Sequence, residues 1–139
     1  METLLTHTTE TIVKNKFYEI AINKVKSRVY IQIKGFWRSP QEAGNYLKDL
    51  DRALQGFSGK FTLLVDLTQM ISHPLEVQPI HLQAQQLLLS RGLLQTAEVY
   101  KSSFVQFQTT KISKQSKMPL QQFTSIEGAE AYLDSIKNG

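Results

Sequence analysis

The order of the strand and helix patterns along this chain predicts an α/β domain with a mixed, mostly parallel sheet. Two adjacent segments with strand-like alternation come first, at residues 17–23 and 28–34, and a helix pattern and an apolar strand ending at Asp66 follow. Strands that are joined through helices favour parallel pairing with right-handed crossovers. Two strands separated by a few residues favour an antiparallel hairpin. The sheet should therefore open with a hairpin and continue in parallel.

The opening hairpin follows from side-chain alternation. Val29, Ile31 and Ile33 alternate with polar or amphipathic residues, which is the period of a half-buried strand. The preceding segment, residues 17–23, shows the same period less regularly, and residues 24–27 are too few for anything but a tight turn.

The first helix is predicted by a start signal at Ser39. Serine there can accept a hydrogen bond from an orphan amide, Pro40 suits the first helical position, and Glu42 can reach back. Apolar residues then recur at helical spacing through Leu54, and Gly56 or Gly59 can end the helix.

A central strand should follow at residues 61–65, because a short, almost continuously apolar run is typical of a strand covered on both faces. We expect a loop from Asp66 to Gln78 and then a helix that Pro79 opens and that stops near Gly92. The last expected elements are a strand at 96–100, a short helix at 104–112, a strand at 121–123 and a helix capped at 124–127, which makes about four helices.

Length and composition indicate one globular domain. The chain has 139 residues, of which 41% are hydrophobic and 20% charged. We expect a flexible tail at residues 1–11, where threonines are frequent, and a single domain at residues 12–139. The start of the chain lacks the pattern of a secretory signal, and we expect a cytoplasmic protein.

Several classes of function find no support in the sequence. With no cysteine, the chain has no thiolate nucleophile, disulfide or thiolate metal site, and its three histidines lack the spacing of a zinc motif. We therefore predict no metal, no cofactor and no catalytic residues. No apolar run approaches the roughly 20 residues that a membrane span requires.

The net charge of +4 raises the question of nucleic acid binding. The basic residues between Lys14 and Arg38 lie at both ends of the predicted hairpin and need not share one surface, so we predict no nucleic acid partner. A second cluster, Lys111, Lys114 and Lys117, has no acidic residue near it in the sequence. It is either a solvated face or a surface that meets an anion.

Two segments give the chain a resemblance to a known family. Residues 63–68 read Leu-Leu-Val-Asp-Leu-Thr at the end of the central strand, and residues 123–133 run from a strand into a short helix with an acidic start. With the element order, these segments resemble the SpoIIAA-like group of STAS domains, the sulfate-transporter and anti-sigma-factor-antagonist fold, over residues 15–137. The resemblance implies a non-enzymatic regulatory module that acts through protein contacts.

In antagonist members of this family, the loop after the Asp-Leu-Ser/Thr strand carries an Asp-Ser-Ser or similar phosphate acceptor that switches partner binding. The corresponding residues here, 70–77, read Met-Ile-Ser-His-Pro-Leu-Glu-Val, so the acceptor pair is missing and Ser72 lies a few residues early. The resemblance is therefore to a STAS-like scaffold without the standard phosphate acceptor.

Two loops are candidate sites, because ligands of open α/β sheets meet the loops beyond the carboxyl ends of the parallel strands. The first has two aromatic residues and a cation, namely Phe36, Trp37 and Arg38. It is either a binding loop or a hydrophobic cover over the helix start with Arg38 exposed. The second is a switch or partner loop with hydroxyl, imidazole and carboxylate groups, namely Asp66, Thr68, Ser72, His73 and Glu76. His73 and His81 are both expected on polar surfaces.

Three functions remain open on these observations. The first is a protein-binding regulatory module whose protein partner is unidentified. The second is a carrier of a small apolar or lipid-like ligand, since leucines crowd the end of the second helix at 87–94; the same leucines could instead form a homodimer seam. The third is a hydrolase or transferase that uses the loop from Asp66 to Gln78, where a carboxylate could orient an imidazole.

Overall fold

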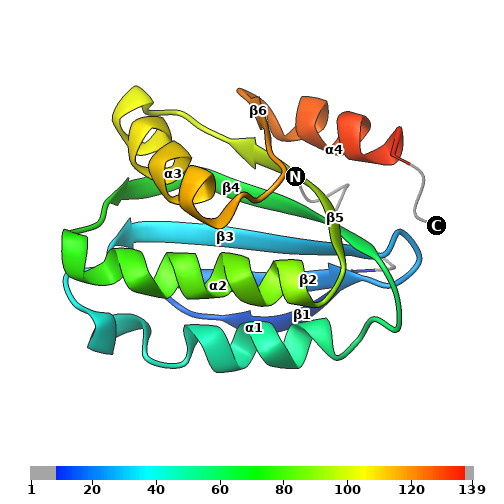
Figure 1. Ribbon diagram of the computed structural model, residues 1–139, viewed down its shortest axis with the longest axis horizontal. Coiled ribbons are helices and arrows are strands. Elements are labelled where there is room, and N and C mark those ends of the chain that lie inside the picture. The colour runs from blue at the N-terminus through cyan, green and yellow to red at the C-terminus, as the bar shows by residue number, and fades with distance from the viewer. Residues whose placement is uncertain (1–8, 137–139) are drawn as a thin grey trace.

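The computed structural model describes residues 9–136 and forms them into a six-stranded sheet flanked by helices (Figure 1). The strands are β1 Thr9–Lys14, β2 Tyr18–Asn23, β3 Arg28–Phe36, β4 Phe61–Ser72, β5 Leu93–Val99 and β6 Gln121–Phe123. The helices are α1 Tyr46–Leu54, α2 Gln78–Ser90, α3 Ser103–Ser116 and α4 Ile126–Asp134, with short 3₁₀ turns η1 Pro40–Ala43 and η2 Leu75–Val77. Within these residues, no helix is long and apolar enough to cross a membrane.

The strands lie in the sheet in the same order as in the chain, from β1 to β6. β1, β2 and β3 pair antiparallel, and every pair from β3 to β6 is parallel. This confirms the predicted mixed sheet with an N-terminal hairpin, and the number of described helices matches the prediction.

β1 is a strand that the sequence analysis did not predict. Residues 1–8 of the expected tail lie outside the described residues, but Thr9–Lys14 pair with β2 across a bulge between Thr11 and Val13. The side chains of β1 are exposed or half-buried and lack a clean alternation, so the sequence carries no strand signal there.

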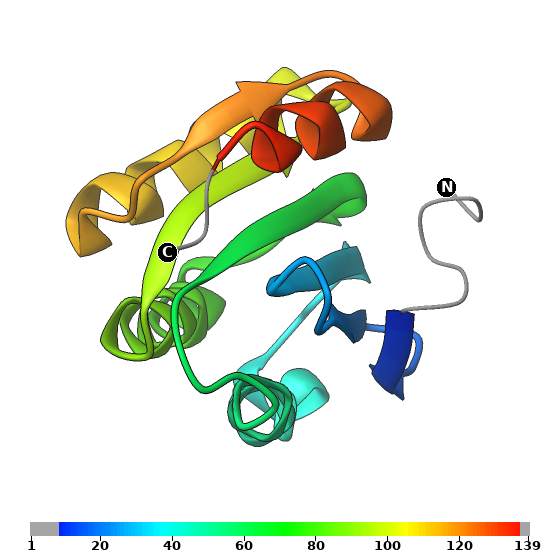
Figure 2. The same ribbon diagram turned by 90° about the vertical axis from the view of Figure 1, so that its right-hand side faces the viewer.

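The helices cover the two faces of the sheet unequally (Figure 2). α1, α2 and α3 lie on one face, over the main core that includes Ile31, Leu50 and Leu63. α4 packs on the other face against β4 and β5, where Leu133 and Ala129 meet Leu64. Successive side chains of a strand point to opposite faces, so β3 supplies Ile31 to the first core and Tyr30 to the second.

The first helix begins later than predicted. Residues 40–43 form the 3₁₀ turn η1, and α1 starts at Tyr46. Ser39 has the extended backbone of a cap, but its side chain makes no capping hydrogen bond. Glu42 instead accepts from the N–H of Arg38 at 2.7 Å and from its guanidinium at 2.8 Å. The predicted start signal therefore marks a turn that precedes the helix.

The loop that was expected to start at Asp66 is largely strand. β4 continues to Ser72, because β3 also continues, to Phe36, and offers it hydrogen-bonding partners as far as Ser72. β5 likewise begins at Leu93, three residues before its predicted start, and α3 extends to Ser116. Leu93 and Leu94 thus belong to the sheet and not to the end of the second helix.

Candidate functional site

The two predicted loops lie side by side at the carboxyl end of β3 and β4. The register of the parallel pair places Phe36 opposite Ser72, so the segments that leave the two strands start together. Gly35 has φ +64°, a conformation that side-chain-bearing residues rarely adopt, and the register shifts after it. This kink turns the chain so that the residue after Phe36 enters the core.

Trp37 is part of the core and does not belong to an exposed binding loop. Its side chain is fully buried, and its Nε1–H donates a hydrogen bond of 2.9 Å to the carbonyl of Phe17. Tyr18 and Tyr46 meet its ring edge to face at 6.0 and 5.3 Å between centroids. Of the predicted binding loop, only Phe36 and Arg38 are exposed.

His73 and His81 stack on Trp37, with ring centroids 4.6 and 5.0 Å from the indole. Nδ1 of His73 and Nε2 of His81 are 2.8 Å apart, a distance at which one nitrogen donates and the other accepts. Both were expected on polar surfaces, and both expectations are wrong. The extension of β4 carries His73 into the interior, and α2 turns His81 toward the sheet.

The environment of this histidine pair, His73 and His81, keeps both imidazoles neutral at pH 7. Burial lowers the pKa of His73 to about 4, although the carbonyl of Gly35 acts in the opposite direction. Burial, followed by the neighbouring imidazole of His73, lowers the pKa of His81 to about 3. A buried imidazole without a counter-charge favours its uncharged form.

Acid should therefore destabilise the protein through the histidine pair. Below the ordinary imidazole pKa of 6.5, the unfolded chain binds protons that the folded chain does not, so stability falls as the pH falls toward 4. Between pH 7 and pH 5, the free energy of unfolding should fall in both proteins. In His81→Phe we expect this fall to be smaller than in the wild type by about 2 kcal/mol, as measured by urea unfolding. Equal losses in both proteins would contradict this assignment.

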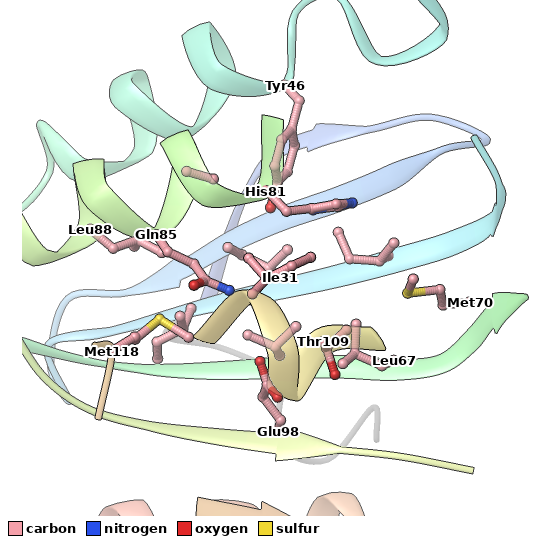
Figure 3. Close-up of a pocket in the computed structure, with 15 residues that line it drawn as sticks. Ile31, Tyr46, Leu67, Met70, His81, Gln85, Leu88, Glu98, Thr109 and Met118 are labelled. Carbon is pink, nitrogen blue, oxygen red and sulfur yellow. The ribbon is translucent and has the colours of Figure 1, made fainter. Parts of the chain in front are cut away.

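A small cavity lies between the sheet and helices α2 and α3 (Figure 3). Glu98 from β5, His81 and Gln85 from α2, and Thr109 from α3 line it together with apolar side chains. The carboxyl of Glu98 accepts a hydrogen bond from the hydroxyl of Tyr100, which in turn accepts from Thr109 Oγ1 at 2.9 Å. Burial raises the pKa of Glu98 to about 8. Glu98 is thus a buried carboxylic acid that is protonated at pH 7.

The size of this cavity bears on the predicted carrier of an apolar ligand. Its volume is about 50 Å³, whereas a cavity that binds benzene measures roughly 150 Å³. The space suits ordered water and is too small for a lipid chain. Leu88 is buried in the core, and Leu87 and Leu93 pack against it.

Asp66 and Thr68 lie on the sheet face opposite to His73. Asp66 Oδ1 accepts from the backbone N–H of Thr68 at 2.9 Å and from its hydroxyl at 2.6 Å, and Oδ2 accepts from Gln32 at 3.3 Å. The carboxylate therefore cannot orient the imidazole of His73, which is bound to His81. The geometry does not assemble the acid–base set on which the hydrolase alternative depended.

Large apolar side chains are exposed at the carboxyl end of β3 and β4. The set, which we call the apolar patch, is Phe36, Ile71, Leu75, Phe104 and Phe107, which are 43–74% exposed. They come from the ends of both strands, from η2 and from the start of α3, which lie at the left of Figure 1. The amide of Gln108 donates to the carbonyl of His73 at 3.2 Å and ties α3 to the segment after β4.

Sequence reasoning missed the apolar patch as a unit. Ser72 lies between its members Ile71 and Leu75, and Glu76 is exposed beside it, so part of the predicted switch loop is at this surface. Among residues 9–136, Val25 is the one other exposed large apolar side chain, and it lies in the turn between β2 and β3. The available signal was the pair of phenylalanines in a helix without a strong apolar stripe.

The fold has been seen before in solved structures. An uncharacterised DUF3478-family protein from Shewanella loihica, described as having a SpoIIAA-like fold, superposes over 87% of this chain and 97% of its own, with a TM-score of 0.65 and 14% identity. This chain has a SpoIIAA-like fold. SiaC of Pseudomonas aeruginosa matches 84% of this chain and 100% of its own, with a TM-score of 0.53 and 11% identity.

Comparison of the amino-acid sequence with known families and proteins found no relative of this chain. No known family profile matches the chain, and no curated protein sequence matches it. The structural match therefore establishes the architecture, and the function must be argued from the surface of this chain.

Proposed function

We propose that this chain is a non-enzymatic cytoplasmic regulatory module that binds a partner protein through the apolar patch. The observation that carries the proposal is the concentration of exposed large apolar side chains at one end of the sheet. Exposed apolar surface of this kind marks interaction sites, and aromatic residues are enriched at the centres of interfaces. Three of the five patch residues are phenylalanines.

The position of the patch supports the same function. It lies beyond the carboxyl ends of the parallel strands, where open α/β sheets commonly bind their ligands. The SpoIIAA-like fold and the resemblance to STAS domains, whose antagonist members act through regulated protein contacts, agree with a binding role. Trp37 and His73, which stack on each other, are close in the chain to Phe36 and Leu75, so the buried ring stack anchors the segments that present them.

Ser72 offers this surface a means of regulation. It is half-buried between two patch residues, Ile71 and the nearby Leu75. A phosphate there would add roughly two negative charges among apolar side chains and would disfavour a hydrophobic contact. We therefore expect Ser72→Asp to weaken partner binding.

The test is site-specific photo-crosslinking in the host, followed by reconstitution. A photoreactive residue at position 75 should capture one protein, whereas the same residue at position 25 should not. With that purified protein, Leu75→Glu should weaken binding at least about tenfold, because a buried contact would be replaced by an unpaired charge. Val25→Glu is the matched control, since Val25 is 80% exposed and lies in the β2–β3 turn.

Three outcomes would overturn the proposal. Equal weakening by Val25→Glu would show that added charge acts non-specifically. Unchanged binding by Leu75→Glu would remove the patch from the interface. Capture of a second copy of this chain, with a dimer that Leu75→Glu dissociates, would assign the patch to self-association.

A further inference from the structure

An open groove lined by lysines runs between α3 and the edge strand β6. Two adjacent hollows, about 450 and 600 Å³ in volume, share Thr110, Lys114 and Gln122 in their walls. Lys111 lines the first hollow and Lys117 the second, so the lysines follow the groove from one end to the other. Phe107, a member of the apolar patch, lines the first hollow and joins the two surfaces.

The positive charge of this groove is not balanced by neighbouring groups. Neither α3 nor β6 contains an acidic residue, and the walls of both hollows contain none. Within residues 9–136, every arginine forms an ion pair, but Lys111, Lys114 and Lys117 form none. Like charges three residues apart on one helix repel each other, so an anionic ligand would relieve a repulsion that the fold retains.

β6 also presents backbone hydrogen-bonding groups along the same groove. It is the last strand of the sheet and pairs only with β5 among the described strands. The carbonyl of Phe123 accepts from the N–H of Tyr100, on the β5 side. Because backbone groups alternate in direction along a strand, Gln122 turns its N–H and C=O to the open side. An open edge of this kind accepts an added strand.

The side chains of the groove wall are held in place. Gln106 donates to the side-chain oxygen of Gln122, and the amide nitrogen of Gln122 donates to Thr110 Oγ1 at 2.9 Å. These contacts fix α3 against β6 and leave the lysines free to meet a ligand.

We propose that the lysine groove binds an extended acidic peptide segment, which adds to the open edge of β6 and places carboxylates against Lys111, Lys114 and Lys117. This rests on the proposed function, because the segment would belong to the protein bound at the apolar patch, next to Phe107. The groove favours a peptide over a nucleic acid, since it contains no arginine and a single aromatic side chain on which a base could stack.

The test is NMR titration of the ¹⁵N-labelled protein with a synthetic acetylated and amidated peptide, four repeats of Val-Glu. Saturable shifts should appear at the amides of residues 111–117 and 121–123 and should weaken at higher salt. A Val-Gln repeat should bind at least about tenfold more weakly. The triple variant Lys111→Glu, Lys114→Glu, Lys117→Glu should lose the shifts and keep the wild-type fold by circular dichroism.

A second triple variant, Lys24→Glu, Lys48→Glu, Lys60→Glu, is the matched control, because it changes the net charge equally at exposed lysines elsewhere. Equal loss in this control, equal binding of the Val-Gln peptide, or tighter binding of an oligothymidine at the same amides would each overturn the proposal. Leu75→Glu should leave peptide binding intact. Failure of the peptide titration therefore reports on the groove, whereas failure of the crosslinking at position 75 reports on the apolar patch.

Discussion

Replacing Trp37 with alanine should lower the free energy of unfolding by about 3–5 kcal/mol, the range for large buried aromatic side chains. The substitution would remove the hydrogen bond to Phe17 and the ring on which His73 and His81 stack. The carbonyl of Phe17 would keep only its other donor, the N–H of Lys34 at 2.9 Å. Urea unfolding followed by circular dichroism measures the loss.

The adjacent aromatic residue provides the control for this prediction. Phe36 is 43% exposed, so Phe36→Ala should change stability by less than about 1 kcal/mol. The loss of stability in Trp37→Phe should lie between those of Phe36→Ala and Trp37→Ala, because phenylalanine keeps most of the ring contacts and lacks the indole N–H. A loss from Phe36→Ala as large as that from Trp37→Ala would contradict the placement of Trp37 in the core.

The second large effect should come from Glu98, as a stability that falls with rising pH. The pKa of Glu98 in the folded protein, about 8, lies above its ordinary value of 4.5. Between these values the unfolded chain releases a proton that the folded chain retains, so ionisation favours unfolding. The contribution of protonated Glu98 to the free energy of unfolding is fully present below pH 4.5. It is lost progressively as the pH rises to about 8.

Glu98→Gln should remove this dependence, because an uncharged amide can still accept from the hydroxyl of Tyr100. The difference in free energy of unfolding, variant minus wild type, should therefore increase by about 3 kcal/mol from pH 5 to pH 8. The measurement is a series of urea unfolding curves across that range. A constant difference between the two proteins would show that Glu98 titrates normally in the folded state.

Glu98 and the histidine pair should together set the pH of greatest stability. The contribution of the two histidines to the free energy of unfolding increases as the pH rises toward 6.5. The contribution of Glu98 decreases as the pH rises above 4.5. From these three groups, the slopes cancel near pH 6.5. Glu98→Gln should flatten the alkaline side of the profile, and His81→Phe should reduce the slope on the acid side.

Much of the architecture could be predicted from local patterns. The alternation of Val29, Ile31 and Ile33 and the apolar run at residues 61–65 were sufficient to predict a hairpin followed by parallel strands. The last helix was predicted from its capping signal, and Ser125 does accept from the N–H of Gly128. These features depend on neighbours in the chain, so they can be read without knowledge of distant contacts.

The candidate site depended on contacts between distant segments. His73 follows a serine and precedes a proline, which is typical of a surface loop, and it is buried because β3 pairs with the extension of β4. From the sequence, Trp37 could be a binding anchor or a cover over the helix start, and only the fold placed its ring among Tyr18, Tyr46 and the histidine pair. Asp66 and His73 are seven residues apart, but alternate strand faces separate them.

The sequence by itself determined the order of the elements from β2 onward and the apolar residues that β3 and β4 supply to the core, because side-chain periodicity is a local property. The tertiary structure decided which polar groups are buried, where a neutral carboxylic acid faces a cavity, and which apolar side chains remain uncovered. Those outcomes depend on the register between strands and on the way in which α2 and α3 pack over the sheet. Phe36, Leu75 and Phe104 lie at the same end of the sheet only because the fold brings three distant segments there.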